Sequence, residues 1–181
     1  MPEKPFDDNE TSEFATGSDA YKARRLEIRL AKNLKEPNLF KNLPKHVQDL
    51  FLSEAHLREE ELPVYGFFED EETWIFSTTR RLLWSRPGFK HAMRYEDIRD
   101  INAPEMKKVL DEPIPPFDSE RYEELQVKVR TTKVSLRWLS LEDRQGYLYK
   151  LLSKPGEIYP IWDFINFMAK LVQIHRGDGR T

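Results

Sequence analysis

The stretch from residue 77 to residue 101, STTRRLLWSRPGFKHAMRYEDIRDI, contains the strongest fold signals in the chain. Two arginines, Arg80 and Arg81, come directly before the apolar triplet 82–84, and a Pro87-Gly88 pair follows shortly after. Pro-Gly pairs interrupt regular structure and mark turns. We therefore predict a strand over RRLLWSR, a turn at RPGFK, and a second strand over HAMRYEDIRDI that runs into a short bend.

Segments before this stretch carry similar strand signals. LPVYGFF, residues 62–68, and TWIFST, residues 73–78, are rich in residues that favour strands, and the polar run EDEE separates them. Gly66 weakens the centre of the first strand. Strands that recur about every ten residues along a chain are typical of an antiparallel meander.

The chain after the meander is less regular. Residues 103–120 contain four prolines and predict a short helical turn near 104–111 followed by an extended loop. EELQVKVRTT and KVSLRWLS, which together cover 123–140, alternate apolar and polar residues and predict a β-hairpin. Residues 141–153 are interpreted as a loop with a helical turn.

Helical periodicity marks both ends of the chain. A helix is expected to begin at Ser18 or Asp19 and to end at Pro37, and a second is expected from Pro44 with its apolar face around Phe51. The last helix, from Pro160 to His175, is so apolar that we expect much of it to be buried.

These signals divide the chain into three parts. Residues 1–18 are expected to be a disordered acidic leader, and residues 19–58 a helical extension. Residues 59–176 are expected to form one domain that contains a loop insert at 103–120. The fold class is therefore α+β, an antiparallel half-barrel or sandwich that a C-terminal helix caps and two N-terminal helices precede.

Composition excludes several kinds of function. The 29 basic and 32 acidic residues give a net charge of −3, so we expect no general nucleic-acid binding. No segment is long and apolar enough to be a signal peptide or a membrane span. The chain has no cysteine, which excludes disulfides and thiolate chemistry, and a reducing cytoplasm is its simplest location.

Catalytic and cofactor motifs are missing from the sequence as well. It has no phosphate-binding glycine loop, no zinc-binding His-Glu-x-x-His motif and no suggestive order of Ser, His and Asp, and its four histidines lie far apart. We therefore expect no metal, no cofactor and no catalysis; an enzyme of unknown class remains a third hypothesis.

Short strands closed by an apolar C-terminal helix, together with the opening stretch, resemble a pleckstrin-homology-like (PH-like) or GRAM-like domain of bacteria. FSTTRRLLW is similar to the Thr-x-x-Arg-Leu segment of that family, and MRYEDIRDI is similar to its Tyr-x-Asp-Ile-x-x-Ile segment. Glu61 and Leu62 would open the first strand. The resemblance covers about residues 60–176 and implies a module that binds rather than catalyses.

The residues that carry the resemblance have structural roles in our interpretation. Arg81 is expected to pair with Asp97 across neighbouring strands, and the triplet 82–84 to fill the core together with Tyr95 and Ile98. Lipid-binding members of the family place basic residues in the first strand loop. The same loop here, residues 69–72, holds four carboxylates that would repel an inositol phosphate.

The charge blocks leave two interpretations of function besides that of simple solvated faces. The first is a non-enzymatic module that docks a basic protein partner, for example as an inhibitor or immunity-type protein. Its acidic surface would comprise Glu59, Glu60, Glu61, Glu69, Asp70, Glu71 and Glu72. The alternative is a peripheral membrane module whose first helix meets anionic lipid. Its basic residues would be Arg24, Arg25, Arg29 and Lys32. The oligomeric state is left open.

Overall fold

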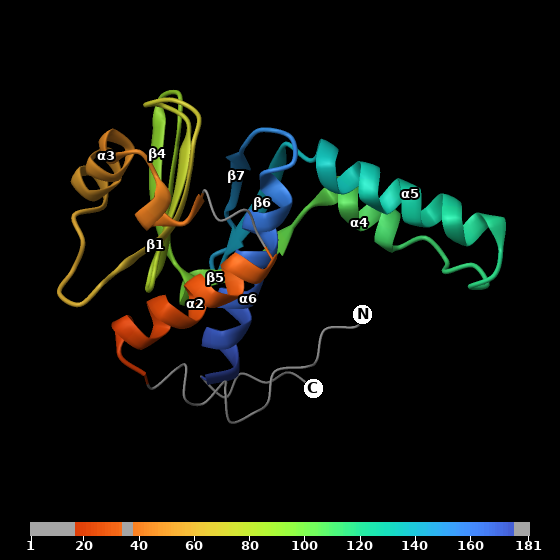
Figure 1. Cartoon of the computed structure of the whole chain (residues 1–181), viewed down its shortest axis with the longest axis horizontal. Helices are drawn as coiled ribbons and strands as arrows, with labels where there is room; N and C mark the ends of the chain where they lie inside the picture. Colours follow the sequence, from red (N-terminus) through yellow and green to blue (C-terminus); the bar gives the residue numbers. More distant parts are fainter. Residues whose placement is uncertain (1–16, 34–37, 176–181) are drawn as a thin grey trace.

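Two antiparallel sheets organise the chain, whose computed structural model describes residues 17–33 and 38–175 (Figure 1). The four-stranded sheet has the order β1-β2-β3-β4, and the three-stranded sheet has the order β5-β6-β7. Their strands are β1 (Pro63–Phe68), β2 (Trp74–Thr78), β3 (Arg81–Arg86), β4 (Phe89–Arg94), β5 (Ile98–Asn102), β6 (Trp138–Asp143) and β7 (Leu148–Leu152). The predicted α+β class and the antiparallel meander of the first four strands are confirmed. The single strand predicted over residues 91–101 is wrong, because residues 95–97 form a 3-10 turn and β5 belongs to the three-stranded sheet.

Five described helices accompany the sheets. They are α2 (Asp19–Asn33), α3 (Lys45–Ala55), α4 (Pro104–Leu110), α5 (Glu120–Ser135) and α6 (Ile158–His175), with short 3-10 turns η2 (Phe40–Asn42) and η3 (Tyr95–Asp97). Two helices precede the sheets and one follows them, as predicted. Residues 1–16 of the predicted leader lie outside the described residues. Pro37, the predicted end of the first helix, lies outside them as well. Within the described ranges, no helix has the length and apolar character needed to cross a membrane.

The apolar triplet of the opening stretch is buried because both faces of the four-stranded sheet are covered. Leu83 lies opposite Phe76 of β2 and packs with Val47 and Phe51 of α3 on one face. Leu82 and Trp84 point to the other face, where they join the main core. Successive side chains of a strand alternate between faces, so three consecutive apolar residues are expected only in a strand that is buried on both sides.

The face under α3 is a tightly packed aromatic cluster. The Phe51 ring stacks on Phe76 with centroids 4.7 Å apart and lies 5.5 Å from Trp74. A Cβ atom at Gly66 would come within 2.3 Å of the Phe51 ring. Glycine in the middle of β1 is therefore explained by the close approach of this ring.

The main core lies between the two sheets and α6. Ile161, Phe164 and Met168 of α6 are buried there, together with Tyr95 and Ile98 from the opening stretch. The Tyr95 ring meets Phe164 edge to face, with centroids 6.4 Å apart. The predicted burial of the last helix and the predicted core positions of Tyr95 and Ile98 are confirmed.

The predicted hairpin over 123–140 is wrong, because residues 120–135 form the helix α5. The Ser119 side chain caps this helix by accepting a hydrogen bond from the Tyr122 amide at 3.3 Å, and Glu120 and Glu123 lie in its first turn. The alternation of apolar residues was too short to decide the structure. Val127 is exposed, whereas Val129 packs partly against the core, so the two do not share a face.

The hairpin that was predicted over residues 123–140 lies further along the chain. Residues 138–143 and 148–152 form β6 and β7, so the predicted helical turn in 141–153 is wrong. Gly146 adopts a positive φ of 88° in the connecting turn, and the Asp143 carboxylate accepts amide hydrogen bonds from Gln145 and Tyr147. These contacts form a turn that joins two strands.

Candidate functional site

The α4–α5 hairpin projects from the side of the two sheets (Figure 1). We call residues 104–135 the projecting arm. Met106 of α4 belongs to the main core and attaches the base of the arm to it, and Val109 of the same helix is also buried. By contrast, none of the sixteen residues of α5 is buried. Most helices of globular proteins are stabilised by burial of one apolar face, so α5 is unusual in this chain.

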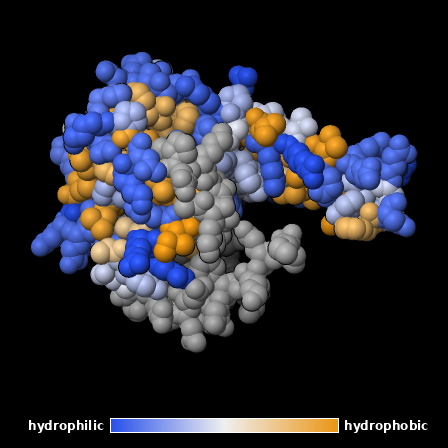
Figure 2. Space-filling view, viewed as in Figure 1, coloured by the Kyte–Doolittle hydropathy of each residue, from blue (hydrophilic) through white to orange (hydrophobic). Residues whose placement is uncertain are grey.

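Large apolar side chains are exposed along the arm, and Figure 2 shows them as orange patches on its surface. They are Leu110, Ile114, Phe117, Val127 and Val134. Ile114 and Phe117 have exposed fractions of 79% and 81%. The Phe117 ring nevertheless has a fixed neighbour, Tyr122, with centroids 4.6 Å apart. Apolar side chains gathered on one exposed segment are typical of an interaction surface.

The outer end of the arm, residues 110–124, is strongly acidic, and we call it the arm tip. Its carboxylates are Asp111, Glu112, Asp118, Glu120, Glu123 and Glu124, against a single basic residue, Arg121. Glu112 pairs with Lys128 of α5, which holds the loop against the helix. The arm tip therefore combines exposed apolar side chains with a large excess of negative charge.

The acidic residues predicted from the sequence do not form one surface. Glu69, Asp70, Glu71 and Glu72 lie in the turn between β1 and β2, where the Asp70 carboxylate accepts the amide hydrogen bonds of Glu72 and Thr73. Glu59 and Glu60 precede the opposite end of β1 and are exposed. Six strand residues separate the two groups, which corresponds to about 20 Å.

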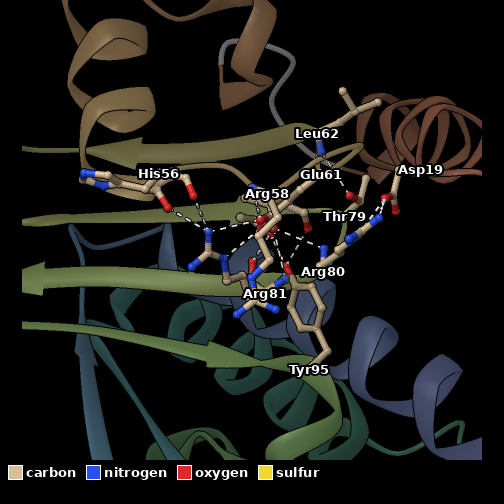
Figure 3. A network of polar contacts seen from close by, with 12 residues as sticks. Asp19, His56, Arg58, Glu61, Leu62, Thr79, Arg80, Arg81 and Tyr95 are labelled. Atoms are coloured by element: carbon tan, nitrogen blue, oxygen red, sulfur yellow. Dashed lines mark hydrogen bonds and ion pairs between the residues drawn. The ribbon is translucent and has the colours of Figure 1, made fainter.

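Glu61, the remaining residue of the predicted acidic surface, is buried and cannot contact a protein partner (Figure 3). Its place in that surface was predicted wrongly. Its carboxylate accepts two hydrogen bonds from the Arg81 guanidinium, at 2.8 and 3.1 Å, and one from the Thr78 hydroxyl at 2.6 Å. The predicted Arg81–Asp97 pair is therefore wrong. Arg81 lies opposite Arg94 across β3 and β4, and Asp97 belongs to the turn η3 rather than to the neighbouring strand. The guanidinium instead meets Glu61, two residues before β1.

Burial alone raises the pKa of Glu61, but hydrogen bonds from Arg81, Thr78 and the Arg58 amide outweigh it and hold the pKa below its ordinary value. The same guanidinium donates to the Ala55 carbonyl at 2.7 Å, at the end of α3. Glu61 and Arg81 thus join α3, β1 and the β2–β3 turn. This role agrees with the structural interpretation of the opening stretch.

A second ion pair attaches α2 to the same turn. The Arg80 guanidinium lies 2.5 Å from the Asp19 carboxylate, whose side chain is almost completely buried, and 3.6 Å from the exposed Glu60. Ser18 begins the helix as predicted, since its side chain accepts the Tyr21 amide hydrogen bond. Arg80 and Arg81 therefore extend in different directions from one turn, to α2 and to Glu61.

Beside these pairs lies an open cleft of about 610 Å³, which we call the arginine cleft. It is lined by Gly17, Ser18, Asp19, Lys22, Arg58, Glu60, Glu61, Thr79, Arg80, Arg81, Arg94, Tyr95 and Glu96. Tyr95 closes it on the inner side, and its hydroxyl donates to the Thr78 carbonyl at 3.1 Å. Burial raises the pKa of Tyr95 above the ordinary tyrosine range, so the ring stays neutral.

The basic residues of the membrane hypothesis all belong to α2, but they differ in how much the structure describes. Arg24 is exposed and Arg25 is half-buried. Arg29 and Lys32 lie on the helix, and their side chains are outside the described part of the structure. The apolar residues Leu26 and Leu30 of the same helix are buried in the main core.

Residues 17–33 and 38–175 contain no candidate metal site. No three His, Asp or Glu side chains of these ranges come together in a way that would hold a metal ion. The arm tip was missed by sequence reasoning. Ser119, followed by acids in the first helical turn, was the signal that could have located α5.

Comparison with known proteins yields no relative: no family model matches the chain, and no curated protein or solved structure is significantly similar to it. The resemblance to PH-like domains therefore stays a prediction.

Proposed function

We propose that this chain is a non-catalytic protein-binding module that holds a basic partner on the tip of its projecting arm. The observation that carries the proposal is the exposure of Ile114 and Phe117 among six carboxylates, on an arm whose longer helix buries no residue. The proposal keeps the acidic surface and basic partner expected from the sequence, but moves the surface from the seven predicted residues to residues 110–124.

Charge and apolar contact would have different roles in such binding. The carboxylates of the arm tip would raise the rate at which a basic surface is encountered, and this effect weakens with salt. Ile114 and Phe117 would supply the affinity by entering apolar pockets of the partner. Because Met106 fixes the base of the arm in the main core, little ordering would be needed when the partner binds.

The narrower proposals are consistent with this geometry. A small acidic inhibitor or immunity-type protein of bacteria could cover the basic surface of a toxin with such an arm, in the cytoplasm. The four-stranded and three-stranded sheets, followed by an apolar helix, support a PH-like fold as the scaffold. The membrane alternative has less support, because Leu26 and Leu30 of α2 are already buried and cannot enter a bilayer.

The test is a capture experiment with matched variants of the full chain. The double variant Ile114→Ser/Phe117→Ser changes only highly exposed residues of the arm tip, so it should fold as the wild type does. Leu148→Ser, at a position 71% exposed on β7, is the control. Captured proteins are identified at low and at moderate salt.

We expect a basic protein in stoichiometric amount with the wild type and with Leu148→Ser, reduced by moderate salt and lost with the double variant. A partner that binds the double variant as well as the wild type would contradict the assignment to the arm tip. Capture that does not respond to salt would contradict the role of its carboxylates.

A further inference from the structure

We propose that the arginine cleft binds a small phosphorylated molecule, at a site separate from the arm and independent of the function proposed for it. The cleft lies where the start of α2, the α3–β1 loop, the β2–β3 turn and the end of β4 meet. Five basic residues line it: Lys22, Arg58, Arg80, Arg81 and Arg94.

The acidic residues of the cleft are occupied by particular arginines. Asp19 holds Arg80 at 2.5 Å, Glu61 holds Arg81 at 2.8 Å, and Glu96 lies 3.1 Å from Arg94. Glu60, at 3.6 Å from Arg80, is the fourth carboxylate of the lining. The three pairs neutralise Asp19, Glu61 and Glu96 and leave Glu60 as the one carboxylate in excess. They also restrict the guanidinium groups, which reduces the ordering needed to bind an anion.

Two cations remain. In the described part of the chain, the side chains of Lys22 and Arg58 have no ion-pair partner, although both line the cleft. Figure 3 shows Arg58 extending past Glu61 toward Arg81 and Tyr95. With five basic and four acidic residues, the lining has a net positive charge, because the two unpaired cations outnumber the one carboxylate in excess, Glu60.

The chemistry of these groups favours phosphate over other anions. A guanidinium offers parallel N–H donors that match two phosphate oxygens, and a lysine adds a mobile positive charge. The volume of about 610 Å³ lies in the range of sites for small molecules and exceeds what one phosphate fills. We therefore assign the cleft to a phosphorylated molecule of about the size of a nucleotide or a sugar phosphate.

The test is titration of the ¹⁵N-labelled full chain with inorganic pyrophosphate and with ATP, at constant ionic strength set with sodium chloride. Arg58→Gln and Lys22→Gln remove one unpaired cation each. Arg130→Gln and Lys108→Gln are matched controls on the projecting arm, at exposed residues outside the cleft. Thermal unfolding without ligand shows whether each variant is folded.

We expect saturable shifts at residues 17–22, 58–61, 79–81 and 94–96, with ATP binding more tightly than pyrophosphate. Arg58→Gln and Lys22→Gln should each weaken binding about tenfold, the effect of one charge-assisted contact, whereas the controls should not change it. Shifts that do not saturate by about 10 mM, or affinity that is equal in Arg58→Gln and Arg130→Gln, would overturn the proposal. Neither result bears on partner capture by the arm tip.

Discussion

Three consecutive residues of β3, Leu82, Leu83 and Trp84, are all buried, whereas the sixteen residues of α5 include none that is buried. The two regions belong to one chain of 181 residues and differ in what surrounds them. The four-stranded sheet has a helix on one face and the main core on the other. Helix α5, by contrast, packs only on α4 and on the edge of the main core. Residues of the sheet thus determine the stability of the fold, and residues of the arm remain available for contact with a partner.

The largest expected effect comes from removing a phenylalanine ring that packs on the four-stranded sheet, compared with removing one in the arm. Phe51→Ala removes a ring that packs on Phe76 and Trp74, and we expect it to lower the free energy of unfolding by about 3–5 kcal/mol. Phe117→Ala removes a ring that is 81% exposed, and we expect a change within about 0.5 kcal/mol. Denaturant unfolding of the two variants measures both. Equal losses would show that the arm is part of the folding core.

A smaller effect is expected at the ion pair that joins the elements around the sheet. Glu61→Gln removes the charge that Arg81 meets in a buried position, and we expect a loss of about 2–3 kcal/mol near neutral pH. Glu60→Gln changes the neighbouring residue, whose side chain is 78% exposed, and should leave the unfolding midpoint unchanged. This pair of variants separates a buried charge from an exposed one in the same loop.

The pH dependence of this effect follows from the lowered pKa of Glu61. A carboxyl group whose pKa is lower in the folded state stabilises the fold above the ordinary glutamate value of 4.5. That contribution is lost as the pH falls below 4.5 and through the lower folded pKa. Unfolding measured between neutral pH and pH 3 should therefore be less sensitive to acid in Glu61→Gln than in the wild type. Parallel curves would contradict the role given to Glu61.

The difference between the two regions also explains which parts of the fold the sequence could predict. The strands of the four-stranded sheet were located because their signals are local: aromatic and branched residues in short runs, with breaks at residues 69–72 and at Pro87-Gly88. The helix α5 was not predicted, because Leu125, Val127 and Val129 alternate with polar residues as they would in a strand. The capping contact of Ser119 and the absence of a partner strand decide the structure there.

The candidate sites depend on contacts that sequence order does not reveal. Glu61 was grouped with Glu59 and Glu60 because they are adjacent, but the burial of its carboxylate against Arg81 distinguishes it. The arginine cleft gathers four separate segments of the chain, so neither the cleft nor its unpaired cations could be identified beforehand. The exposure of Ile114 and Phe117 follows from the position of the whole arm rather than from a pattern of neighbouring residues.

The smallest expected effect, at Val127, is the sharpest test of the contrast between β3 and α5. Valine is a poorer helix former than alanine, and Val127 is 60% exposed in the middle of α5. Val127→Ala should therefore leave stability unchanged or raise it by up to about 0.5 kcal/mol, since it improves helix propensity and removes no buried contact. Leu83→Ala in β3 should lower it by about 2–5 kcal/mol. Hydrogen exchange should show the same contrast, with the amides of 120–135 exchanging faster than those of β2 and β3. If Val127→Ala instead destabilised the purified chain, α5 would have a buried face in solution, and its apolar residues would already be covered before a partner is met.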